Sequence, residues 1–192
     1  TSRPFKGFQE GRRVQLTLSN AEKVRENVEG IEFVVPRNIT QSFVVHDFLS
    51  GNFGVYGDYP LLDKVQKKNM QFGRFINQND IDNNKKVVVI SEDIYKQLYE
   101  KDEEAVASYI QINSINFKVI GVFESEGMGG GPSADMHIPF TTFQQVYNSG
   151  DRIGWMMITG RPEFDIKQIE KDAKLILKNL NSIHPDDKRA FG

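Results

Sequence analysis

The amino-acid sequence predicts an α+β fold with two lobes, one built from both ends of the chain and one inserted between them. Two observations lead to this prediction. The opening and closing segments each combine a strand pattern with an amphipathic helix pattern, and the middle of the chain is richer in strand patterns. Neither end segment can bury its apolar face alone, so we expect the two to pack together as one layer.

The opening segment predicts a β-α-β unit. Residues 13–18 alternate apolar and polar side chains, which is typical of a half-buried strand. Ser19 and Glu22 have the spacing of a capping box for a helix that ends at Gly30. Alternation returns over residues 31–35 and predicts a second strand.

The middle of the chain reads mainly as strands. Residues 40–58 have a strand-like pattern broken by three glycines, and residues 60–70 fit a short helix. A buried strand at Val87–Ile90 and a helix at Glu92–Tyr99 follow. The next segment predicts a hairpin that turns at Asn113–Ser114.

The closing segment predicts two strand–helix units. Met136–Phe140 is a strand, and Thr142 with Gln145 forms a second capping box. Trp155–Thr159 is another strand, and Asp165 caps the last helix, whose apolar residues recur at steps of three and four. We expect the polar tail after this helix, from His184 to the end, to fray.

Composition excludes several classes of function. The 192-residue chain has 24 basic and 26 acidic residues and a formal net charge of -2, so it lacks the basic surface of a nucleic-acid-binding protein. It has no cysteine, which removes thiol catalysis and disulfides. No window reaches the roughly 18–20 apolar residues that span a bilayer, and the opening TSRPFKGF lacks a signal-peptide pattern.

One acidic segment begins like a calcium loop but does not complete it. Asp80, Asp82 and Asn84 place oxygen ligands at alternate positions. Lys85 then stands where the loop needs glycine, and Ser91 stands where a bidentate glutamate closes the site. We therefore predict a solvated turn that leads into the next strand.

Other candidate chemistry is weaker. Residues 124–135 read as a loop, and its glycines, Gly127–Pro132, lack the Lys-Ser/Thr of a phosphate-binding loop. The histidines His46, His137 and His184 are not at metal-ligand spacing, and no serine lies in a G-x-S-x-G motif. The sequence thus predicts no catalytic residue, no cofactor and no metal.

Aromatic side chains offer one candidate partner surface. Phe53, Tyr56 and Tyr59 cluster among glycines, and Met128 lies in the glycine-rich loop. Aromatic residues dominate the binding energy of protein interfaces. Two interpretations remain open, a partner surface or the small core of the inserted lobe.

An ordered series of segments resembles a known family. The series is GRFINQNDI, KKVVVISEDIYKQLY, YIQINSINFKVIGVF, the glycine-rich loop and HIPFTTFQ. It resembles the MacB-like periplasmic core domain of ABC transporter permeases, and the ends TSRPFKGF and HPDDKRAFG resemble a Bacteroidetes-type subgroup. The matching positions are Gly73, Arg74, Phe75, Asp80, Val87–Ile90, Ile110, Ile112, Phe117, Val119–Val122 and Ile138–Thr142.

Two segments depart from the family pattern. Lys101–Ser108 has no proline or glycine where members commonly carry a G-x-x-P-[IL]-G segment, and Asn113–Ser114 replaces an Asn-Gly turn. Both departures concern loops, so they bear on the subgroup more than on the fold.

The resemblance implies a porter-like lobe, β-α-β plus β-α, from residues 1–39 and 150–192, and a strand-rich, sabre-like inserted lobe from residues 40–149. In this family the domain lies between the first and second transmembrane helices and has no active site. The implied function is to couple ATP-driven motion to export or extrusion of a substrate, with ATP hydrolysed in a separate cytoplasmic domain.

The partners that the resemblance implies are a second permease copy, a nucleotide-binding domain or subunit, and a membrane-fusion protein or a lipoprotein. The implied location is the periplasmic side of an inner-membrane protein in a Gram-negative bacterium. An exposed hook or apolar groove would favour a lipoprotein-releasing permease. A deep pocket with converging polar groups would favour another class, a free-standing ligand-binding protein or enzyme.

Overall fold

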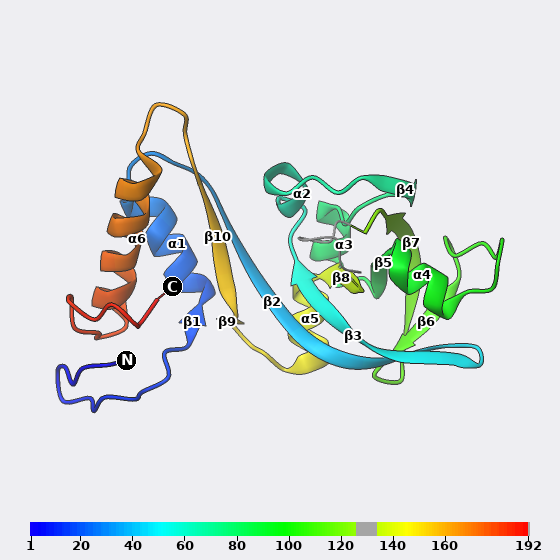
Figure 1. Cartoon of the computed structure of the whole chain (residues 1–192), viewed down its shortest axis with the longest axis horizontal. Helices are drawn as coiled ribbons and strands as arrows, with labels where there is room; N and C mark the ends of the chain where they lie inside the picture. The colour runs from blue at the N-terminus through cyan, green and yellow to red at the C-terminus, as the bar shows by residue number, and fades with distance from the viewer. Residues whose placement is uncertain (126–133, 192) are drawn as a thin grey trace. The chain divides into compact units, whose positions relative to one another are not determined.

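The computed structural model describes residues 1–125 and 134–191, which form two compact units. We call Thr1–Pro36 together with Asp151–Gly192 the terminal unit, and Arg37–Gly150 the inserted unit. Figure 1 shows both chain ends in the terminal unit. Helices and strands alternate within a strand-rich whole, so the predicted α+β class is confirmed.

The terminal unit contains two helices and two strand pairings. β1 pairs antiparallel with β9, and β10 lies beside β2, where the Phe33 amide donates to the Thr159 hydroxyl at 3.1 Å. The helices α1 and α6 pack against each other (Figure 1). The elements are β1 (Leu16–Thr17), α1 (Leu18–Asn27), the first residues of β2 (Ile31–His46), β9 (Arg152–Ile153), β10 (Trp155–Gly160) and α6 (Ile166–Leu180).

Helix α1 begins earlier than the sequence predicts. The capping box expected at Ser19 and Glu22 is wrong, because Thr17 is the N-cap. The Thr17 hydroxyl accepts a hydrogen bond from the Asn20 amide at 3.3 Å, and the Asn20 side chain accepts one from the Thr17 amide at 3.4 Å. The strand before the helix is short for the same reason, since the cap ends it at Thr17.

Helix α6 begins where the sequence predicts. Asp165 is its N-cap and accepts a hydrogen bond from the Lys167 amide at 3.0 Å. The tail that follows does not fray as expected. Ile183 and Asp187 are each 1% exposed, because the tail packs against the first residues of the chain.

The inserted unit is built on one mixed sheet. Its strand order is β2-β3-β8-β5-β7-β4, and β6 pairs with both β2 and β7. The elements are the remainder of β2, β3 (Leu49–Asp58), α2 (Leu62–Val65), β4 (Met70–Gly73), α3 (Gln78–Asp82), β5 (Val87–Ser91), α4 (Glu92–Leu98), β6 (Tyr109–Ile112), β7 (Ile115–Phe123), β8 (Asp135–Pro139) and α5 (Phe140–Tyr147).

A long hairpin of β2 and β3 takes the place of the broken strand pattern expected over residues 40–58. His46 pairs with Leu49, so the two residues between them form the turn. The three glycines do not interrupt the hairpin, because all lie within β3. At two of them an aromatic side chain packs against the glycine. A Cβ atom at Gly51 would lie 2.6 Å from the Phe53 ring, and one at Gly57 would lie 2.6 Å from Phe143.

The core of the inserted unit confirms the strand, helix and hairpin predicted at its centre. Every residue of β5 is buried; β7 and β8 pair with it along its two edges, and helix α4 contacts it. Helix α4 follows directly and buries Ile94 and Leu98. The predicted turn between β6 and β7 has both Asn113 and Ser114 in the left-handed region, with φ angles of 49° and 64°.

Helix α5 lacks the capping box predicted at Thr142 and Gln145. The helix begins at Phe140 with Pro139 as its N-cap, and no side chain caps it. The Thr142 hydroxyl instead donates to the carbonyl oxygen of Lys85 at 2.8 Å. The hydroxyl therefore fastens α5 to the residues before β5 rather than to its own backbone.

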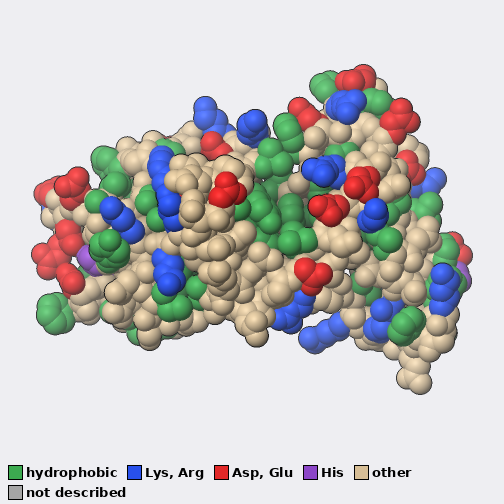
Figure 2. All heavy atoms as spheres, turned by 180° about the vertical axis from the view of Figure 1, so that it is seen from behind, with side chains coloured by type: hydrophobic (Ala, Val, Ile, Leu, Met, Phe, Trp, Pro, Cys, Tyr) green, Lys and Arg blue, Asp and Glu red, His purple; other side chains and the backbone are tan. Residues whose placement is uncertain are grey.

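The described helices include none that is both long and apolar enough to cross a membrane. Figure 2 shows acidic, basic and apolar side chains interspersed over one face of the molecule. Such mixing agrees with the net charge of -2 and with the absence of a basic footprint in the sequence.

Candidate functional site

The structure separates the residues predicted to form a partner surface. Phe53 is 4% exposed and belongs to the hydrophobic core of the inserted unit, so for this residue the partner-surface interpretation is wrong. Tyr56 and Tyr59 are half-buried, and burial raises the pKa of both. Tyr59 also stacks on Phe140 at 4.7 Å between ring centroids. Met128 lies outside the described residues.

Exposed apolar side chains lie instead on the β2–β3 hairpin and on β6, which pairs with β2. We call Phe43, Phe48, Leu49 and Tyr109 the hairpin surface, and each of them is more than 40% exposed. Phe48 is 103% exposed because it occupies the two-residue turn, where no element covers it. The sequence offered one signal for this surface: Phe48 follows His46 and Asp47 at a turn, where polar residues are more common than a large apolar one.

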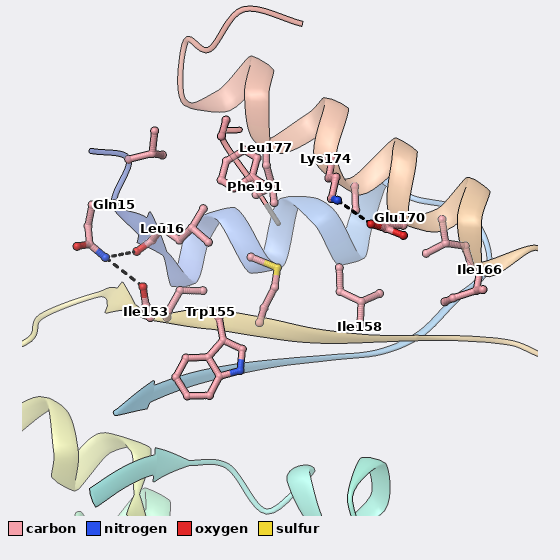
Figure 3. A pocket seen from close by; sticks show the side chains of 16 residues that line it. Gln15, Leu16, Ile153, Trp155, Ile158, Ile166, Glu170, Lys174, Leu177 and Phe191 are labelled. Atoms are coloured by element: carbon pink, nitrogen blue, oxygen red, sulfur yellow. Dashed lines mark hydrogen bonds and ion pairs between the residues drawn. The ribbon is translucent and has the colours of Figure 1, made fainter. Parts of the chain in front are cut away.

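A cavity of about 690 Å³ lies within the terminal unit between α6 and β10 (Figure 3). Most of the residues that line it are apolar, among them Ile158, Ile166 and Leu177, but polar atoms form nearly half of the exposed wall. The polar side chains on its walls have partners: Glu170 and Lys174 form an ion pair at 2.6 Å, and the Gln15 amide donates to two backbone carbonyls.

A buried charged cluster lies between β2, β3 and β8. The Asp58 carboxylate accepts hydrogen bonds from the Arg37 guanidinium at 2.5 and 3.0 Å and from His137 Nδ1 at 2.7 Å. Burial opposes ionisation of Asp58, but the hydrogen bonds from His137 and Arg37 outweigh it and lower its pKa. All three residues are less than 9% exposed, so the cluster holds strands together and does not meet solvent.

The acidic segment before β5 is not the solvated turn that we predicted. It forms helix α3, and Asp80 is fully buried at its N-terminus. The Asp80 carboxylate accepts hydrogen bonds from the Arg74 guanidinium at 2.6 and 3.1 Å and from the Asn77 amide at 3.0 Å. These hydrogen bonds tie the segment that contains Arg74 to the start of α3. The Asp82 side chain is exposed and accepts a hydrogen bond from the Gln78 side chain at 2.7 Å.

The two ends of the chain meet in the terminal unit. The Ser2 amide and hydroxyl each donate to the Asp187 carboxylate at 2.6 Å, and Arg12 donates to the Ser182 carbonyl oxygen at 3.2 Å. The Ser2 hydroxyl is the main reason that the pKa of Asp187 lies far below its usual value. Residues near the two ends of the described chain, Ser2 and Asp187, therefore lie side by side.

The three histidines lie in separate places, as their sequence spacing indicates. His137 belongs to the Asp58 cluster, and His184 packs edge-on against Phe5. His46 has two acidic neighbours, Asp47 and Glu103, and these three are the group among the described residues whose ligand atoms lie within 4.8 Å of one another. Sequence spacing did not reveal this group because Glu103 comes from a distant loop.

Comparison with known proteins places the chain in a family. The model of the MacB-like periplasmic core domain matches residues 2–176. A macrolide export ATP-binding/permease protein MacB from Bdellovibrio bacteriovorus is 22% identical over 90% of this chain and 27% of its own length. The MacB of Aggregatibacter actinomycetemcomitans is 26% identical over 91% of this chain and 28% of its own length. The chain thus spans little more than a quarter of these relatives.

Solved structures share the fold at low sequence identity. The periplasmic region of MacB from Actinobacillus actinomycetemcomitans superposes with a TM-score of 0.77 at 23% identity, covering 91% of this chain and 78% of that one. The extracellular domain of the ABC-type transporter YknZ from Gram-positive bacteria gives a TM-score of 0.77 at 18% identity, covering 89% and 87%. The similarity extends over both units.

Proposed function

This chain belongs to the MacB-like periplasmic core domain family, and on that basis we propose that it couples ATP-driven motion in the cytoplasm to the export of a substrate from the cell. The family match over residues 2–176 is the observation that carries the proposal. In this proposal the chain is the extracytoplasmic domain of a permease and has no catalytic role. ATP is hydrolysed in a separate cytoplasmic domain or subunit.

The meeting of the chain ends supports a mechanical role. Ser2 and Asp187 are joined by two hydrogen bonds, so transmembrane segments attached at either end would enter the terminal unit together. A displacement of those segments would then act on the terminal unit as a whole. Strand β2 continues from the terminal unit into the inserted unit, so we propose that motion of the terminal unit is passed on to the inserted unit.

The proposed partners are a second permease copy, the nucleotide-binding part and a membrane-fusion protein. The hairpin surface is the region of the inserted unit that we assign to partner contact, because its aromatic side chains are exposed without serving the core. Tyr56, Tyr59 and Met128 remain part of the proposed partner surface. We place the parent protein in the inner membrane of a Gram-negative bacterium, with this domain in the periplasm.

The coupling proposal is tested in the parent membrane protein. Residues 3–186 are replaced by a flexible Gly/Ser linker, and both substrate export and ATP hydrolysis are measured in membranes. We expect export to be abolished while ATP hydrolysis continues, because the motor lies elsewhere. Export that continues without the domain would refute the proposal. A charged substitution at the fully exposed turn residue, Phe48→Asp, should weaken export without unfolding the domain.

A lipoprotein-releasing permease is the second candidate function, and the cavity in the terminal unit is the observation that favours it. A cavity of about 690 Å³ lined mostly by apolar residues can take part of an acyl chain. We expect a fluorescent diacylated lipopeptide to bind the isolated chain, and Ile158→Glu in the cavity wall to weaken binding. The matched control is Leu175→Glu on the exposed side of α6. Equal binding by both variants, or none by the unaltered chain, would rule this candidate out.

A further inference from the structure

We propose that His46, Asp47 and Glu103 form a binding site for a divalent transition-metal ion, with Zn²⁺ as the ion that fits best. The site lies in the inserted unit, where the β2–β3 turn meets the loop between α4 and β6. It is independent of the proposed transport role. The ligand atoms of the three residues lie within 4.8 Å of one another.

Both ring nitrogens of His46 face hydrogen-bond acceptors, so a metal ion at Nε2 would take the place of the proton that Nε2 donates to Glu103. The Nδ1 atom of His46 lies 3.0 Å from the carbonyl oxygen of Tyr109, and a carbonyl oxygen only accepts hydrogen bonds, so Nδ1 carries a proton. Metal-binding histidines characteristically donate their second nitrogen to a carbonyl or carboxylate, which fixes the tautomer. The ring is also stacked on Tyr99 at 4.1 Å, and the His46 side chain is 8% exposed.

The remaining nitrogen, Nε2, faces a carboxylate that is itself held in place. Glu103 Oε1 lies 2.8 Å from His46 Nε2, and Glu103 Oε2 accepts a hydrogen bond from the Glu100 amide at 2.9 Å. The backbone carbonyl of Glu103 accepts a further hydrogen bond from the Tyr95 hydroxyl at 2.6 Å. A glutamate on a loop is thus fixed from two directions with one oxygen aimed at the imidazole.

Asp47 supplies the third ligand from the exposed side. It stands next to His46 in the turn with a φ of 48°, a conformation that aspartate tolerates better than most residues. Zinc–ligand bonds of about 2.0–2.2 Å place tetrahedral ligand atoms roughly 3.4 Å apart. Binding would therefore require rotation of the exposed Asp47 side chain and a separation of His46 from Glu103 beyond their present 2.8 Å, and water would take the fourth position.

The donor set selects the class of ion. Imidazole favours zinc and its neighbours, whereas calcium and magnesium prefer oxygen ligands alone. The histidine, aspartate and glutamate together would carry two negative charges, which a divalent cation neutralises. A bound ion would tie the turn at Asp47 to the loop at Glu103. It would therefore fix the position of the turn that carries the next residue, Phe48, which belongs to the hairpin surface.

The test is titration of the whole 192-residue chain, without an affinity tag, with ZnCl₂ by calorimetry. We expect one Zn²⁺ per chain, no comparable binding of Ca²⁺, and an X-ray absorption spectrum with one imidazole and otherwise oxygen ligands. Replacing a group that only orients a ligand lowers metal affinity about 10–100-fold, so His46→Gln and Glu103→Gln should each weaken binding at least that much.

Matched variants keep the result interpretable. Asp47→Asn changes an exposed turn residue, so it should weaken zinc binding while the variant stays folded. His184→Gln is the control, because His184 also has an acidic neighbour, Asp186 at 3.9 Å, but lies in the terminal unit. Absence of stoichiometric zinc binding, or zinc binding that survives His46→Gln, would overturn the proposal. His46 and Glu103 would then form an ion pair only.

Discussion

Ser2 and Asp187 lie 185 positions apart in the sequence and are joined by two hydrogen bonds of 2.6 Å. The bonds use both the backbone amide and the hydroxyl of Ser2 and both oxygens of the carboxylate. Asp187 is 1% exposed in this arrangement, and the Arg189 amide donates to it at 3.0 Å. This contact joins residues near the two ends of the chain and closes the terminal unit.

We predict that Asp187→Asn lowers the melting temperature of the chain at neutral pH. Asparagine keeps the shape but loses the charge that receives the hydrogen bonds from Ser2. The folded protein lowers the pKa of Asp187, so its contribution to stability is present above the unfolded pKa of about 3.9. It is lost as the pH falls from there through the lower folded value. The difference in melting temperature should shrink in that acidic range.

Asp186→Asn is the control for this measurement. The Asp186 side chain is 76% exposed and lies 3.9 Å from His184, so its replacement should change the melting temperature little. Equal effects of the two substitutions at neutral pH would show that the junction of the chain ends does not stabilise the unit.

We predict that Asp58→Asn, in the buried charged cluster, lowers the free energy of unfolding by several kcal/mol. Asp58→Asn leaves Arg37 as a buried cation without its carboxylate. Removing one partner of a buried ion pair costs about 3–5 kcal/mol, which urea unfolding would measure. Asp82→Asn, an exposed aspartate, should change the free energy of unfolding by no more than about 0.5 kcal/mol. A loss below 1 kcal/mol for Asp58→Asn would mean that the cluster adds little to stability.

Replacing each of two phenylalanines of the β2–β3 hairpin by alanine should lower the stability of the chain by very different amounts. Phe53→Ala empties a core position and should cost about 3–5 kcal/mol of unfolding free energy. Phe48→Ala removes a side chain that touches little else, so the cost should stay within about 0.5 kcal/mol. Chemical denaturation of the two variants compares them directly, and similar costs would contradict the hairpin register described here.

The turn between β6 and β7 can be stabilised by one substitution. Ser114 has a φ of 64°, a left-handed conformation that costs an ordinary residue roughly 1–2 kcal/mol and glycine nothing. Ser114→Gly restores the preferred Asn-Gly turn and should raise the unfolding free energy by about 0.5–1 kcal/mol. Ser50→Gly, in strand β3, should instead lower it by a similar amount. A loss of stability in Ser114→Gly would contradict the turn geometry.

The fold was predictable where local signals and tertiary contacts agree. The continuous apolar run of β5 predicted a strand buried on both faces, and all five of its residues are buried at the centre of the sheet, between β7 and β8. Asp165 and the period of α6 located the last helix correctly. The capping boxes at Ser19 and Thr142 failed because a nearby side chain, Thr17, or a distant carbonyl, Lys85, offered a better hydrogen bond.

The functional surfaces were harder to predict than the framework. Phe53 and Phe48 are only five positions apart, and sequence alone could not tell which one is buried. The outcome depends on the register of the hairpin, which sets every side chain on one face or the other. Likewise, His46 and Glu103 come together because two loops meet, although 57 positions separate them.

The sequence by itself determined the α+β class, the central strands and helices, and the order of segments that identifies the family. These properties follow from the periodicity of neighbouring residues and from motifs that keep their spacing along the chain. Only the tertiary structure decided that Asp80 is buried, that the tail is held by Ser2, and that His46 faces two acids. Each of these depends on partners distant in sequence, and their burial and hydrogen bonds form only when the chain has folded.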